Sequence, residues 1–171
     1  MVVNWPAAGA VLLPHIGGFA GAIATRSNVE TWYKGLQKPC FTPPTWSFGC
    51  VWSGIYSGIG YASYMVWRDG GGFEGEARLP LAVYATNLAL NWAWTPIFFG
   101  AKKTQLALYE INLITATAVA TGVLFYKINP IAGYLFIPYI AWLGLATALN
   151  YKIWKDNPEE TDDKIVEIKD K

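Results

Sequence analysis

Five long stretches of the sequence carry at most one charged residue each, and they lie within the first 154 of its 171 residues. A bilayer core about 30 Å thick is spanned by about 20 apolar residues in a helix. The strands of a membrane barrel are shorter, about 10 residues, and alternate in polarity. These stretches do not alternate, so they predict an all-α membrane protein, a bundle of five transmembrane helices. The predicted helices cover residues of about 5–25, 45–67, 79–100, 104–126 and 131–154.

The charged residues predict how the chain is divided. Twelve of the 25 charged residues lie in residues 152–171, which leaves 13 for the preceding 151 residues. We therefore expect a transmembrane domain over residues 1–155. Residues 156–171 are rich in Asp, Glu and Lys and poor in apolar side chains, which is typical of a solvated extension.

The distribution of Lys and Arg predicts the orientation, because positive charge near helix ends stays on the cytoplasmic side. With five spans, the first loop, the third loop and the tail share one side. That side holds seven basic residues up to Lys155, against three on the other side (Arg68, Arg78 and Lys127). The charge bias predicts a cytosolic C-terminus.

The sequence lacks the residues that several classes of function require. The net charge is +1 without a basic patch, which argues against nucleic acid binding, and Cys40 and Cys50 cannot form a disulfide framework. No Lys or Arg precedes Arg26, so we expect neither a signal nor a transit peptide. The only histidine, His15, has no partner at metal-ligand spacing, and no phosphate loop, acid pair or nucleophile with a base is visible. We expect no metal, no cofactor and no catalytic residue, and the default is a binding protein for an apolar ligand.

Polar and aromatic side chains inside the helices are the candidates for that binding. Asn87, Asn91 and Trp94 have helical spacing, and amides in lipid are costly unless they face a partner or a cavity. A second stripe runs along residues 139–149, and Trp52 could complete an aromatic chamber. Helix packing explains these stripes equally well at this stage. Small residues four apart, at positions 17 and 21 and at positions 54, 58 and 62, indicate close helix contacts.

The end of the fifth predicted helix matches a loose cholesterol pattern. Leu149, Tyr151 and Lys155 supply its aliphatic residue, tyrosine and base. The same residue types gather at helix ends for ordinary interfacial reasons, so the pattern alone leaves both interpretations open.

Three motifs resemble the translocator protein family, the peripheral benzodiazepine receptors with their bacterial tryptophan-rich sensory relatives. The string LNWAWTPIFFG over residues 90–100 is similar to the family's third-helix signature. The first-loop signature and the fifth-helix signature are carried by Trp32, Tyr33, Leu36, Lys38, Pro39, Pro43, Pro44 and Trp46, and by Pro138, Tyr139, Ala141, Trp142, Leu149 and Asn150.

The resemblance spans residues 5–155 and implies a five-helix bundle in the mitochondrial outer membrane. Its implied partners are cholesterol, protoporphyrin-like porphyrins, drug-like aromatic ligands and the lipid bilayer, and a homodimer is left open. The implied ligand chamber is lined by Ala22, Thr25, Phe48, Gly49, Val51, Trp52, Trp94, Leu106, Tyr109, Leu113, Trp142, Ala146 and Leu149. Asn91, which the helical spacing of the amides indicates, is added to these candidates. The implied cholesterol segment, on the outside of the fifth helix, holds Ala146, Leu149, Tyr151 and Lys155.

Two departures from the family pattern affect the expected chamber. Cys50 stands where many members have proline, and Leu106 stands where mammalian members have tryptophan. Two functions follow from the resemblance. The chain is either a receptor that binds cholesterol or porphyrin, or a porphyrin-degrading enzyme that uses Trp52 and Trp142; binding is favoured because stacked indoles explain affinity without turnover.

Overall fold

The computed structural model describes residues 4–158, and every ordered element in that range is helical. The all-α class is therefore confirmed for the described chain. The elements are α1 (Trp5–Asn28), η1 (Val29–Tyr33), α2 (Thr45–Asp69), α3 (Arg78–Thr95), η2 (Pro96–Gly100), α4 (Thr104–Ile128), α5 (Pro130–Tyr134) and α6 (Ile137–Asp156). The predicted tail beyond Pro158 lies outside the described residues.

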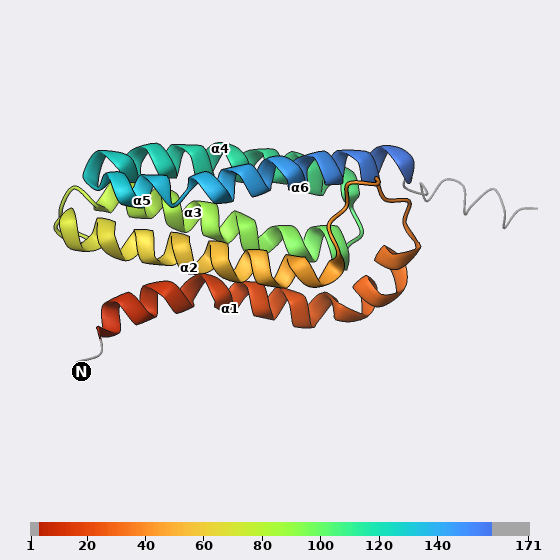
Figure 1. The fold of residues 1–171 in the computed structure, drawn as a ribbon, viewed down its shortest axis with the longest axis horizontal. Helices are drawn as coiled ribbons and strands as arrows, with labels where there is room; N and C mark the ends of the chain where they lie inside the picture. The colour runs from red at the N-terminus through yellow and green to blue at the C-terminus, as the bar shows by residue number, and fades with distance from the viewer. Residues whose placement is uncertain (1–3, 159–171) are drawn as a thin grey trace, which may run out of the picture.

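The helices run side by side along one long axis (Figure 1). The elements η1 and η2 are π-helical turns that extend α1 and α3, and α5 is continued by α6 after a short break. One end of the bundle holds Asn4 and the α2–α3 and α4–α5 connections (Figure 1). The other end holds the η1–α2 loop, the η2–α4 connection and the end of α6. The loops that the basic-residue count assigns to one side are therefore together in space.

Three segments are long and apolar enough to cross a membrane: Trp5–Tyr33, Thr104–Ile128 and Pro130–Asp156. The helices α2 and α3 are less apolar, because they carry polar side chains such as Ser63, Asn87 and Asn91 on buried positions. At about 1.5 Å per residue, the 25 residues of α2 still extend about 37 Å, longer than a bilayer core.

Glycines allow several helices to pack closely, and only some of them are the ones that the four-residue spacing predicts. Gly17 and Gly21 lie against Trp92 and Thr95, so this pair allows α1 to approach α3. A Cβ at Gly54 or Gly58 would have no atom within 4 Å, so neither glycine makes a close helix contact among the described residues. The expectation for that pair is wrong. The close contact between α1 and α2 is made by Gly60 instead, whose Cβ would lie 2.5 Å from the Ala10 carbonyl oxygen.

Hydrogen bonds made by two side chains, those of Asn157 and Lys38, fix the first loop over the end of the bundle. The backbone N–H of Gln37 donates to Asn157 Oδ1 at 2.8 Å, and Asn157 Nδ2 donates to the Gln37 carbonyl at 2.9 Å. Lys38 Nζ donates to the carbonyls of Tyr33, Lys34 and Leu36. The loop is thus attached both to the end of η1 and to the end of α6.

Candidate ligand-binding site

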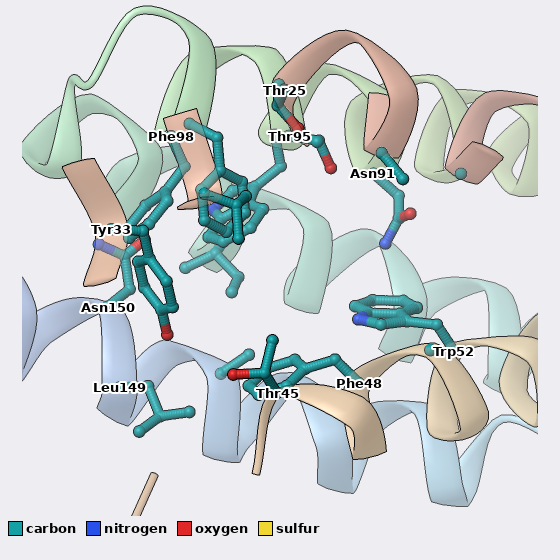
Figure 2. A pocket seen from close by; sticks show the side chains of 18 of the residues that line it. Thr25, Tyr33, Thr45, Phe48, Trp52, Asn91, Thr95, Phe98, Leu149 and Asn150 are labelled. Atoms are coloured by element: carbon teal, nitrogen blue, oxygen red, sulfur yellow. The ribbon is translucent and has the colours of Figure 1, made fainter. Parts of the chain in front are cut away.

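A cavity of about 590 Å³ lies between the helices, towards the end that holds the first loop. Its walls come from α1 and η1, the first turns of α2, the end of α3 with η2, the middle of α4 and the second half of α6. This volume is within the range of small-molecule sites in proteins, about 300–1,000 Å³. Figure 2 shows the lining side chains converging from opposite sides of the bundle.

One wall of the cavity is built from aromatic rings of α2 and α6. Trp52 lies in tilted contact with Tyr56, at a centroid distance of 5.2 Å, and edge-on to Trp142, at 6.5 Å and 90°. Phe48 also meets Trp142 edge-on, at 5.5 Å. The ring nitrogen of Trp52 is turned towards the cavity (Figure 2). Trp92 and Trp94 donate their indole N–H groups to backbone carbonyls, whereas the Trp52 N–H has no acceptor within residues 4–158, so this donor is available to a ligand.

Trp94 forms the opposite wall and is held more tightly. Its ring stacks on Phe98 at 4.7 Å and 17°, and its Nε1 donates to the Ala107 carbonyl at 3.1 Å. Phe98 belongs to η2, the π-helical turn that begins at Pro96. A proline cannot donate the backbone hydrogen bond of a regular helix, and π-turns are frequent at functional sites. The local break brings Phe98 beneath Trp94 and into the cavity wall.

The inner end of the cavity is closed by a buried hydrogen-bond network. Tyr56 donates to Asn91 Oδ1 at 2.6 Å, Asn91 Nδ2 donates to the Tyr139 hydroxyl at 3.1 Å, and that hydroxyl donates to Asn87 Oδ1 at 3.2 Å. Asn87 Nδ2 reaches Thr117 Oγ1 at 2.9 Å. The network joins α2, α3, α4 and α6. The amides of Asn87 and Asn91 therefore face partners, and Asn91 also lines the cavity.

Replacing Asn87 with leucine is expected to destabilise the bundle, because it leaves the fully buried Tyr139 hydroxyl and the half-buried Thr117 hydroxyl with one partner fewer. Hydrogen bonds between membrane helices contribute about 0.6 to 1.7 kcal/mol, so we expect a loss of about 1 kcal/mol in the free energy of unfolding. Unfolding by titration with sodium dodecyl sulfate measures it. Asn112→Leu is the control, since within residues 4–158 that exposed amide bonds only a carbonyl of its own helix; equal losses in both variants would contradict a role of the network.

The outer end of the cavity carries a second set of polar groups. Thr25 is buried, with its hydroxyl bonded to the Gly21 carbonyl at 2.8 Å. Asn150 is buried opposite it, beside Tyr33 (Figure 2), and its Nδ2 donates to the Thr104 carbonyl at 2.8 Å. Lys34 also lies at this end. The cavity is therefore aromatic along its length and polar at both ends, which suits a flat, mostly apolar molecule with polar substituents.

Most residues of the expected chamber do line this cavity. They are Ala22, Thr25, Phe48, Gly49, Trp52, Asn91, Trp94, Trp142, Ala146 and Leu149. Four do not: Val51 packs against the core, and Leu106, Tyr109 and Leu113 are 53%, 66% and 52% exposed.

The phase of α4 explains why three expected residues miss the cavity. The helix buries Ala107, Ile111, Ile114 and Ala118, which are spaced three or four residues apart and so share one face. Positions 106, 109 and 113 lie outside that face and point away from the bundle. Ile111 and Ile114 line the cavity in their place.

The expected cholesterol segment divides between two faces of α6. Ala146 and Leu149 line the cavity, and Leu149 is only 5% exposed. Tyr151 and Lys155 are exposed, one helical turn apart on the outer surface. At about 100° per residue, Leu149 and Tyr151 lie on opposite sides of a helix, so these four residues do not form a single surface.

Sequence reasoning missed the residues that the two π-helical turns supply. Tyr33 meets Phe99 edge-on at 5.3 Å and Phe98 at 6.2 Å, and all three rings line the cavity. His15 also lines this cavity: its Nδ1 lies 2.9 Å from the Val11 carbonyl oxygen, and its ring meets Tyr56 edge-on. The one sequence signal for the second π-helical turn is Pro96, which interrupts the third apolar stretch.

The sequence also matches known proteins over most of its length. The pattern of the TspO/MBR family matches residues 10–155. The translocator proteins of Sus scrofa and Homo sapiens are each 47% identical to this chain over 92% of its length and 94% of theirs. A tryptophan-rich protein TspO of Archaeoglobus fulgidus is 38% identical over 80% of this chain and 87% of its own. These similarities confirm the resemblance that the three motifs indicated, and the chain belongs to the TspO/MBR family.

Proposed function

We propose that this protein is an integral membrane receptor that crosses the bilayer five times and binds porphyrins and drug-like aromatic ligands in the cavity between its helices. The observation that carries the proposal is the cavity itself, whose walls are indole and phenyl rings. Aromatic pairs contribute about 0.5–1.5 kcal/mol beyond the burial of their area, so several rings around one flat ligand add to the affinity that burial of its surface provides.

Titration of the purified protein with protoporphyrin IX tests this function. Bound porphyrin should quench tryptophan emission, because Trp52, Trp94 and Trp142 all line the cavity. A porphyrin-sized competitor without an aromatic ring system should not displace it. Absence of saturable quenching would contradict the proposal.

Cholesterol is the second proposed ligand, held on the outer face of α6 and separate from the cavity. Tyr151 and Lys155 offer a ring and a cation one turn apart where α6 approaches its end. Tyr151 also lies in tilted contact with Trp154, at 6.0 Å. A sterol ring system can pack along such a ridge with its hydroxyl at the height of the lysine.

Replacing Tyr151 with serine is expected to weaken sterol binding several-fold and to leave porphyrin binding unchanged. Loss of one packed ring or one hydrogen bond is worth about 1 kcal/mol. Photo-crosslinking with a sterol probe measures the first effect, and protoporphyrin titration of the same sample measures the second. An equal loss of both ligands would indicate damage to the fold instead.

For localisation we propose the mitochondrial outer membrane with the C-terminus in the cytosol. The support is the basic-residue bias together with the observed grouping of the loops. Protease added to intact organelles should remove a C-terminal tag and spare an N-terminal one, and the reverse result would overturn this orientation.

Enzymatic porphyrin degradation is the second candidate. The observation that favours it is the contact between Trp52 and Trp142, whose ring centroids are 6.5 Å apart in the cavity. Binding remains our choice, because ring stacking explains affinity without turnover. Incubation of protoporphyrin with purified protein separates the two: unchanged pigment supports a receptor, and new products support an enzyme.

A further inference from the structure

A second cavity, of about 370 Å³, lies at the end of the bundle that holds the first loop. It is formed where three segments meet: the end of η1, with Trp32, the connection before α4, with Lys102 and Lys103, and the end of α6, with Asn157 and Pro158. Its location, lining and charge distinguish it from the ligand cavity described above.

The second cavity is positively charged. Lys102 and Lys103 are exposed, and they form no ion pair within residues 4–158. Both precede the first turn of α4, where the helix dipole adds partial positive charge. Two carboxylates near this end, Glu30 and Asp156, are already paired with Arg26 at 3.1 Å and with Lys152 at 3.1 Å. No carboxylate of residues 4–158 forms an ion pair with either lysine, which leaves both free to pair with further negative charge.

The chain continues from the wall of this cavity into an acidic stretch. Pro158 lines it, and the next five residues, Glu159 to Asp163, contain four carboxylates. The point where they leave the bundle is fixed, because the side-chain amide of Asn157 accepts from the Gln37 N–H through its oxygen and donates to the Gln37 carbonyl through its nitrogen. A short tether gives an effective concentration in the millimolar range, which favours an intramolecular partner over a free one.

We propose that the acidic segment 159–163 docks into the second cavity of its own chain, with its carboxylates against Lys102 and Lys103. A segment docked there would also lie beside Trp32 of η1 and Leu36 of the first loop, so docking would add a third contact to a loop that Asn157 and Lys38 already hold. The proposal is independent of which molecule fills the ligand cavity.

Zero-length crosslinking of the full chain in dodecyl maltoside tests the docking. The carbodiimide EDC joins a lysine to a carboxylate only when they are in contact, and a mixture of unlabelled and ¹⁵N-labelled protein separates links within a chain from links between chains. We expect links from Lys102 or Lys103 to the acidic segment at least about fivefold above links from Lys34, within single chains, as expected for a tethered partner. Lys34 is the matched control, exposed at the same end. The links should fall in about 1 M salt, where the Debye length is about 3 Å.

Tryptic cleavage rates test the docking without crosslinking chemistry. In the variant E159Q/E160Q/D162N/D163N, trypsin should cleave after Lys102 and Lys103 several-fold faster than in the parent, with cleavage after Lys34 unchanged. Three results would overturn the proposal: links equal to those of Lys34, links between chains, or lysines protected by added phosphatidylglycerol alike in parent and variant. The last result would assign the cavity to a lipid headgroup.

Discussion

Replacing Trp52 with alanine is expected to weaken binding of protoporphyrin IX more than tenfold while leaving the bundle folded. The indole lines the cavity, its ring contacts Tyr56, Tyr139 and Trp142, and its nitrogen is turned towards the space that a ligand would fill. Truncation of a central aromatic at a binding site costs about 2 kcal/mol or more, which corresponds to a factor of about 30 in the dissociation constant. Fluorescence or calorimetric titration in detergent measures the loss.

The same helix offers a matched control for this experiment. Trp46 is 74% exposed near the start of α2 and does not line the cavity, so Trp46→Ala should bind porphyrin as the parent does. Trp94→Ala should reduce both affinity and thermal stability, since Trp94 also holds the Ala107 carbonyl and packs on Phe98. If Trp52→Ala bound porphyrin like the parent, the cavity would not be the porphyrin site.

The helices could be predicted because a bilayer imposes their length. A charge-free stretch of about 20 residues has few alternatives to a spanning helix, since backbone groups in lipid must be satisfied internally. Local breaks are harder to predict. The stretches 79–100 and 131–154 look continuous in the sequence, yet the first changes to a π-turn at Pro96 and the second breaks between Tyr134 and Ile137. Pro96 lies at the first site and Pro138 just after the second, but mean hydropathy does not distinguish one helix type from another.

The sequence predicts which residues line the cavity where residue chemistry restricts the direction of a side chain. Two amides inside lipid must face partners, and this requirement places Asn91 at the cavity from residue type and helical spacing alone. Leu106 carries no such restriction, because an aliphatic side chain is stable both in a core and in lipid. A residue placed in the cavity by its family position, such as Leu106, therefore lies outside it, because the packing of Ala107 and Ile111 sets the rotation of α4.

The positions of small residues also do not determine which helix face makes a contact. The glycines of α2 show this and lead to a prediction about stability. Spacing alone suggests that Gly54 and Gly58 lie in a helix contact, whereas the structure gives that role to Gly60. A Cβ at position 60 would lie 2.5 Å from the Ala10 carbonyl oxygen and 2.8 Å from Val11 Cα. Both are backbone atoms of α1, so no side chain can rotate away to make room.

Gly60→Ala is therefore expected to move α1 from α2 and to lower the free energy of unfolding by about 2 kcal/mol, within the usual range of about 1–3 kcal/mol for overpacking. Gly58→Ala, two residues away on the same helix, is the control, because a Cβ there meets no atom within 4 Å. Alanine stabilises a helix by up to about 1 kcal/mol relative to glycine, so the control should be neutral or slightly stabilising. Unfolding by sodium dodecyl sulfate compares the two variants in one assay. The effects should have opposite signs or differ by at least about 2 kcal/mol; similar values would mean that α1 adapts freely and that its contact with α2 does not depend on the missing side chain.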